Sequence, residues 1–166
     1  MHLLVAVTLV ASVACAPVYV NGDEGYYAAN ATNGQDPSLI YGELNGYGSW
    51  TWSSQWGRVW VPYANRTPGW RPYTVGQWSY TEYGWTWVSE EPWGASPYHY
   101  GRWGWEANVG GWAWVPGTTW APAWVAWRSG GGCVGWAPLG PAGVVYSTAN
   151  YWVFVQQSNI HHSHVH

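Results

Sequence analysis

The chain has 166 residues, a formal net charge of −3 and only 8% charged residues, and its five cations are all Arg. This length fits one domain or a short repeat array, and the lack of a basic patch excludes a nucleic-acid-binding protein. The chain carries 18 Trp and 13 Tyr but one Phe. Indole and phenol rings combine an apolar body with a polar group. We expect more of these rings than a core of this size can bury, so some should face solvent or a partner.

The first 15 residues are predicted to be a signal peptide. Leu3 to Val13 form a small or apolar run that is long enough for a signal sequence and too short to span a bilayer. Two processing routes fit the end of this run. Ala14-x-Ala16 suits an ordinary signal peptidase, whereas Ser12 to Cys15 is similar to a degenerate lipobox with Cys15 as the lipidated residue. Both predict export, to the periplasm or the outer membrane and cell surface, and the second adds a lipid anchor. A buried N-terminal strand is the structural alternative.

Residues 16–38 are rich in Gly, Asn, Asp, Ala and Tyr and are predicted to be a flexible linker. After either cleavage, Cys133 is the cysteine that remains in the folded part. A single thiol cannot form an internal disulfide. We therefore expect Cys133 to be a small apolar strand residue.

An aromatic motif pair repeats from residue 48 onward. The second motif of each pair occurs as Arg58–Pro62, Trp85–Ser89 and Trp112–Pro116, and successive copies lie 27 residues apart. The first motif precedes it as Gly48–Trp52, Gly76–Tyr80 and Gly101–Trp105. A weaker fourth copy contains Trp124–Trp127 and Val134–Pro138. Such internal periodicity indicates stacked supersecondary units.

Each motif pair predicts one antiparallel hairpin. In Trp-x-Trp, both rings lie on one face of a strand because side chains alternate with period two. Short turn-like segments join the paired motifs, and one hairpin alone is marginally stable in water. We therefore predict an all-β domain over residues 39–155, a compact array of three to four antiparallel Trp-rich hairpins, arranged as a small barrel or sandwich-like fold. Residues 156–166 form a His-rich tail.

The ordered set of motifs resembles a family of Trp-rich bacterial envelope proteins that is labelled a domain of unknown function. The similarity spans about residues 39 to 155. It rests on W-R-P-Y (Trp70–Tyr73), E-P-W-G (Glu91–Gly94), Y-H-Y-G-R-W (Tyr98–Trp103) and the W-x-W-V-P repeats. The resemblance implies export and lipid anchoring, but no established activity.

Two groups of residues are candidates for ligand contact. Linker and turn rings could stack on sugar faces, and these rings are Trp56, Trp70, Tyr83, Trp93 and Trp120. Their alternative role is in the core. Glu91, His99 and Arg102 lie within twelve residues and predict either a ligand-contacting or acid/base cluster, or a buried ion-pair network.

The tail histidines His161, His162, His164 and His166 could bind a transition metal, or form only a polar terminus. No cofactor is predicted. The familiar nucleophile, metalloprotease and phosphate-loop motifs are missing, so an enzyme is not expected.

The leading hypothesis is a non-catalytic envelope module that binds a glycan or a protein partner through exposed aromatics. The first alternative is a structural envelope protein that self-assembles as a homo-oligomer. The second is a glycoside-active enzyme using two of Glu82, Glu90 and Glu91.

Overall fold

The computed structural model describes residues 42–161. Several predictions fall outside them: the signal peptide over 1–15, the linker over 16–38, lipidation of Cys15, and metal binding by His162, His164 and His166. Within residues 42–161, no helix is long and apolar enough to cross a membrane.

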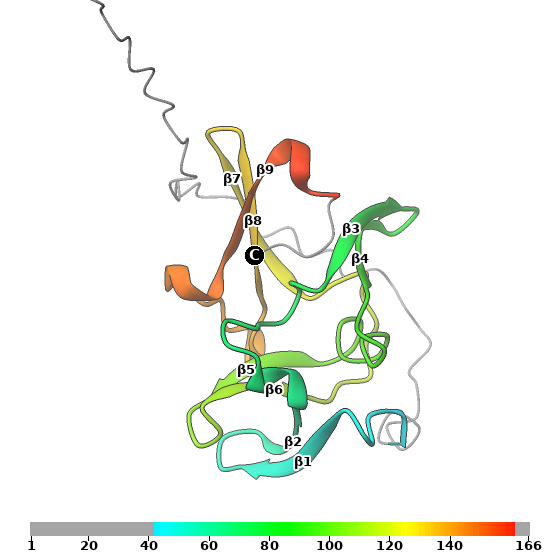
Figure 1. Ribbon diagram of the computed structural model, residues 1–166, viewed down its shortest axis with the longest axis vertical. Coiled ribbons are helices and arrows are strands. Elements are labelled where there is room, and N and C mark those ends of the chain that lie inside the picture. The colour runs from blue at the N-terminus through cyan, green and yellow to red at the C-terminus, as the bar shows by residue number, and fades with distance from the viewer. Residues whose placement is uncertain (1–41, 162–166) are drawn as a thin grey trace, which may run out of the picture.

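The described part of the chain is all-β, and all four predicted hairpins are present (Figure 1). The hairpins are β1 (Gly48–Ser53) with β2 (Gly57–Pro62), β3 (Gly76–Thr81) with β4 (Gly84–Ser89), β5 (Arg102–Glu106) with β6 (Gly111–Val115), and β7 (Val125–Gly130) with β8 (Cys133–Pro138). A ninth strand, β9 (Val153–Gln156), pairs with β8. The 3-10 turns are η1 (Tyr63–Arg66), η2 (Pro141–Gly143), η3 (Ala149–Tyr151) and η4 (Gln157–Asn159).

At least one Trp–Trp pair faces across each hairpin, and the third hairpin has a second pair, Trp105 with Trp112. The opposed residues are Trp50 and Trp60, Trp78 and Trp87, Trp103 and Trp114, and Trp127 and Trp136. Aromatic pairs at such positions stabilise a sheet by roughly 0.2–1 kcal/mol each beyond Ala pairs. A facing Trp pair is therefore the feature that the registers of all four hairpins share.

The hairpins assemble into three open sheets. The first has the order β1-β2-β6-β5, the second is β3-β4, and the third is β7-β8-β9. Hairpins one and three are joined by the pairing of Trp60 with Trp114. Figure 1 shows β3 and β4 to one side of the molecule and β7 to β9 on the other. Each sheet keeps two free edges, so the barrel alternative is wrong.

An aromatic core joins the sheets. Ten of the 18 Trp side chains are buried. Trp78 and Trp136, from the second and third sheets, lie with ring centroids 5.6 Å apart. Tyr73 and Tyr98 are both 0% exposed, and their centroids are 4.7 Å apart. Tyr98 also contacts Trp103 of the first sheet and Trp87 of the second, so this tyrosine pair connects the aromatic side chains of these two sheets.

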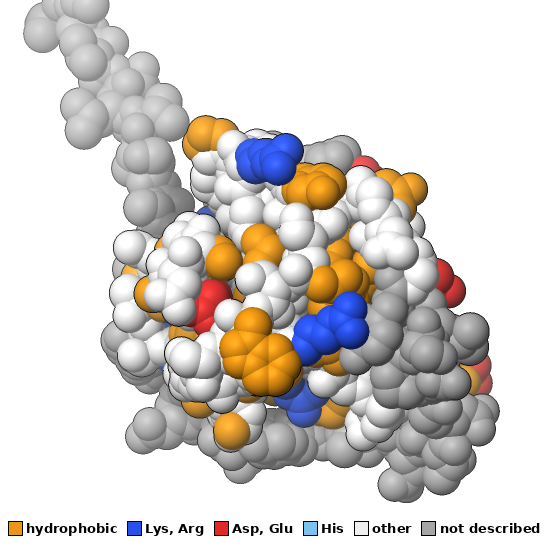
Figure 2. All heavy atoms as spheres, turned by 90° about the horizontal axis from the view of Figure 1, so that it is seen from below, with side chains coloured by type: hydrophobic (Ala, Val, Ile, Leu, Met, Phe, Trp, Pro, Cys, Tyr) orange, Lys and Arg blue, Asp and Glu red, His pale blue; other side chains and the backbone are white. Residues whose placement is uncertain are grey.

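The rest of the rings are only partly covered, as expected from their number. Trp52 is 76% exposed and Trp105 is 42% exposed, and Tyr80 and Tyr83 are 72% and 51% exposed. Figure 2 shows separate hydrophobic patches, some beside Arg side chains, on the face seen from below. Arg side chains also lie over rings, as Arg58 does over Trp50 and Arg66 does over Tyr63. Most indoles nevertheless belong to the core.

Two features at the C-terminal end differ from the sequence-based expectation. Cys133 is buried in β8, as expected, but it is disulfide-bonded and not a lone thiol. The expectation that it could not form a disulfide is therefore wrong; that expectation depended on processing that removes or lipidates Cys15. The folded part also continues past residue 155, since β9 ends at Gln156 and Ile160 is buried.

Candidate functional site

The linker between hairpins two and three is held by aromatic side chains. Four consecutive backbone carbonyls of this linker, from Pro97 to Tyr100, each accept a hydrogen bond from a Trp or Tyr side chain. The donors are, in order, the indole of Trp103, the hydroxyl of Tyr73, and the indoles of Trp124 and Trp114. They come from β5, β6 and two other linkers. Groups fixed by packing and by hydrogen bonds from several elements are suited to a binding site.

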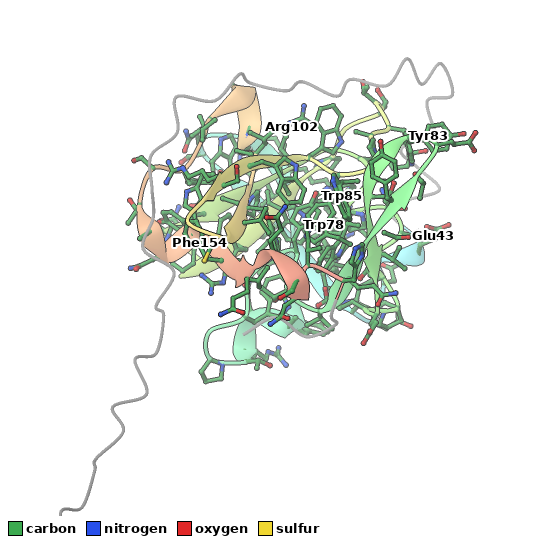
Figure 3. All side chains as sticks on the ribbon, turned by 90° about the horizontal axis from the view of Figure 1, so that it is seen from above. Glu43, Trp78, Tyr83, Trp85, Arg102 and Phe154 are labelled. Carbon is green, nitrogen blue, oxygen red and sulfur yellow. The ribbon has the colours of Figure 1, made fainter. Side chains whose placement is uncertain are left out.

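A row of three rings leads outward from this linker. The His99 imidazole is nearly parallel to Trp120, with centroids 5.7 Å apart and an interplanar angle of 21°. Trp120 meets Tyr83 edge-on, with centroids 5.0 Å apart. Tyr83 lies in the turn between β3 and β4, and Figure 3 shows it at the outer edge of the molecule, away from Trp78. The row therefore runs from the linker to the tip of hairpin two.

His99 is fixed at the inner end of this row. Its Nδ1 lies 3.0 Å from the carbonyl oxygen of Ala121, and its own carbonyl accepts the amide of Ala121 at 2.9 Å. Burial lowers the pKa of His99 from 6.5, although hydrogen bonds to the carbonyls of Ala121 and Pro122 oppose this shift. The imidazole is thus neutral at neutral pH.

Glu91 is a half-buried carboxyl held between two aromatic donors. The indole of Trp70 donates to Oε1 at 2.9 Å, and the hydroxyl of Tyr98 donates to Oε2. Burial raises the pKa of Glu91 to about 7, although both hydrogen bonds favour the ionised form. A carboxyl that titrates near neutrality in an accessible position marks a candidate functional group.

Glu91 and His99 both line an open groove of about 480 Å³. Its lining comes from β4 and the linker after that strand, and consists of Thr86, Trp87, Val88, Ser89, Glu90, Glu91, Pro92, Gly94, Ala95 and His99. This volume lies within the range of small-ligand pockets. Because His99 stacks on Trp120, the ring row continues directly from the groove, and the two together form one surface, the groove–ring surface.

The other predicted ligand residues lie elsewhere. The Arg102 guanidinium lies 3.3 Å from the centroid of the Trp124 ring and donates to the carbonyl of Gly101. Figure 3 shows it well apart from Tyr83. The predicted cluster of Glu91, His99 and Arg102 is therefore only partly assembled, because cation–π packing directs Arg102 onto an indole instead.

Three predicted rings have mainly structural contacts. Trp93 is 7% exposed and packs on Trp60, so it is a core residue and not a solvent-facing ring. Trp70 is half-buried against Trp93 and Trp103. The Trp56 ring lies over Gly104 of β5.

His161 is the one tail histidine within the described residues. It packs on Trp85, and its Nδ1 lies 3.1 Å from the carbonyl oxygen of Trp78. Across residues 42–161, no group of three or more metal-ligating side chains is present.

A family model matches residues 41–143, which is more than half of the chain. The matching model is described as a family of unknown function, DUF6600. The chain belongs to this family. Neither curated proteins nor solved structures gave a match.

The matched DUF6600 region contains the whole groove–ring surface. Two residues that position it were missed from sequence, namely Tyr98, which holds Glu91, and Tyr73, which holds Tyr98. Both come directly after a Pro in the motifs W-R-P-Y and S-P-Y. That shared Pro-Tyr pattern was the available signal, but it does not reveal that the two hydroxyls are buried.

Proposed function

We propose that this DUF6600 protein is a non-catalytic glycan-binding module of the bacterial cell envelope. The observation that carries the proposal is the ring row of Tyr83, Trp120 and His99 beside an open groove. Apolar C–H faces of sugars pack on aromatic faces, while hydroxyl groups need hydrogen-bonding side chains within reach. Thr86, Ser89, Glu90 and Glu91 provide such groups in the groove lining.

The arrangement suits binding better than hydrolysis. Glycoside hydrolysis needs two carboxyls placed on either side of the scissile bond. Glu91 is engaged by Trp70 and Tyr98, and Glu82 lies in the β3–β4 turn outside the groove lining. Rigid anchoring of the linker carbonyls favours a preformed surface, which reduces the entropic cost of binding.

Isothermal titration with envelope-derived oligosaccharides, including peptidoglycan fragments, tests the proposal. Trp120→Ala should weaken binding roughly 3- to 10-fold, which corresponds to the loss of about one aromatic stacking contact. Tyr80→Ala is the control, because Tyr80 is an exposed ring on the hairpin that carries Tyr83, and it packs on Trp85 and not on the ring row. No binding by any oligosaccharide, or equal losses in both variants, would refute the proposal.

A further inference from the structure

The ionisable groups of the groove–ring surface indicate which glycans it accepts. Its groove lining contains two carboxyls, Glu90 and Glu91, and one imidazole, His99, that is neutral at neutral pH. None of the chain's five Arg residues is part of this lining, and the sequence contains no Lys. An anionic sugar would therefore meet like charge from the carboxyls of the described lining.

Carboxyls lie at both ends of the ring row. Glu82 precedes Tyr83 in the turn at the outer end, and its side chain is exposed. Glu90 and Glu91 are at the inner end, where His99 stacks on Trp120. A sugar chain lying on the rings would thus have acidic groups near both of its ends.

We infer that the groove–ring surface selects glycans that carry free amino groups, such as chains of glucosamine, over acidic glycans. This inference rests on the proposed glycan-binding function. The rings pack on the sugar faces, while the ammonium groups are attracted to the carboxylates at either end. Opposite charges at a partly exposed site give such selectivity, and salt weakens it.

The state of Glu91 supports this selectivity and provides a second readout. Because burial raises its pKa to about 7, Glu91 is largely protonated in mildly acidic solution. An ammonium group in the groove favours the ionised carboxylate, so binding should release a proton. Titration in buffers of different ionisation enthalpy at pH near 6 measures that release directly.

The test compares saccharide oligomers of different charge, two of which share one β-1,4-linked glucosamine backbone. A β-1,4-linked glucosamine hexamer should bind at least about threefold more tightly than the N-acetylated hexamer, and a galacturonic acid oligomer should bind most weakly. The preference should shrink at high salt. De-N-acetylated peptidoglycan fragments present the same amine on a cell-wall backbone, and they distinguish that source from a glucosamine polymer.

Variants of the carboxyls separate charge from fold. Glu90→Gln changes an exposed side chain, and Glu91→Gln keeps the shape of the half-buried Glu91 side chain. Each variant should reduce the preference for the amine-bearing hexamer. Glu43→Gln is the control, since it removes the same charge outside the groove lining while its amide oxygen can still accept from Ser96.

The outcomes separate the two proposals. Equal binding of the charged and N-acetylated hexamers, or preference for the acidic oligomer, would overturn the amine selectivity and leave glycan binding intact. Absence of binding to all the saccharides would overturn glycan binding itself.

Discussion

Tyr73 is a single buried residue on which several contacts depend. Its hydroxyl donates to the carbonyl of Tyr98 at 3.0 Å and accepts the amide of Trp124 at 3.1 Å. Its own carbonyl accepts the indole N–H of Trp136 at 2.9 Å. With a φ of 63°, Tyr73 also has left-handed backbone, which is unusual for a bulky residue. Tyr73 thus links the segments that contain Tyr98, Trp124 and Trp136.

Tyr73→Phe should lower the free energy of unfolding by about 1–3 kcal/mol. The ring would remain, but one buried carbonyl and one buried amide would lose their partner. Urea denaturation measures the change. Tyr80→Phe, at a residue that is 72% exposed, should have almost no effect, and a similar loss in both variants would contradict this account.

Glu91 should make stability fall with rising pH. Its pKa is about 7 in the folded chain against an ordinary value of 4.5, so the folded state holds its proton more tightly. This stabilisation is complete below pH 4.5 and is lost as the pH rises to about 7. The groups near the carboxyl are Tyr98, His99 and Glu90.

The measurement is the difference in melting temperature between the protein and Glu91→Gln across this pH range. Burial also lowers the pKa of His99, so protonation of His99 destabilises the fold as the pH falls. This effect is the same in both proteins and cancels in the difference. The difference should favour the unsubstituted protein at low pH. A difference independent of pH would show that Glu91 does not hold its proton more tightly in the fold.

Sequence identified part of the site at this scale. Glu91, His99, Tyr83 and Trp120 were all candidates, and the structure brings them onto one surface. Arg102 was grouped with them by proximity in the chain, but sequence spacing does not show that a nearby indole competes for the guanidinium. For Trp93 the sequence left ligand contact and core burial open, because linker Trp residues in the core and on the surface have the same local sequence pattern.

At the scale of the elements, glycines in the strands make room for rings from elsewhere. A Cβ on Gly104 of β5 would lie 2.3 Å from the Trp56 ring, and one on Gly135 of β8 would lie 2.3 Å from the Phe154 ring. Aromatic side chains placed over strand glycines cover backbone that would otherwise be exposed. This explains why glycine stands next to Trp103 in β5 and next to Trp136 in β8.

Gly104→Ala should destabilise the protein by about 1–3 kcal/mol through overpacking against Trp56. In a Trp56→Ala background the same substitution should be nearly neutral, because the atoms that block the Cβ belong to that ring. A double-mutant cycle by urea denaturation measures this coupling. Gly135→Ala is the contrasting control, since its new Cβ would also lie 2.8 Å from the carbonyl oxygen of Val153, and Phe154→Ala cannot relieve that contact.

The hairpins themselves could be predicted because period-two aromatic motifs and short turns are local signals. The pairing of β2 with β6 could not be predicted. All four hairpins present similar Trp faces, so the pattern does not specify which of them join. Because the four faces are similar, the sequence does not distinguish a barrel from a sandwich. The observed strand order shows that the sheets do not close into a barrel.

At the scale of the whole molecule, the three sheets share one cluster of rings. Trp136 is 0% exposed and contacts Trp78, Trp87 and Trp127, which belong to the second and third sheets. Tyr98 extends the cluster to Trp103 in the first sheet. No sheet has a separate core of its own among these contacts.

Thermal unfolding should therefore be a single cooperative transition. Melting curves followed by Trp fluorescence and by far-ultraviolet circular dichroism should coincide. Trp136→Ala should lower stability by about 3–5 kcal/mol and shift both curves together. Separate transitions for the two signals would mean that the sheets unfold independently.

The pairing of Trp60 with Trp114 also bears on how the chain is made. When the first hairpin has emerged during synthesis, its partner strand is still a full hairpin and two linkers away. Until β6 arrives, the edge of β2 that carries Trp60 has no neighbouring strand, and an unpaired edge promotes aggregation. A nascent or truncated chain ending before residue 111 would thus depend on chaperones, whereas the finished protein covers that edge with its own third hairpin.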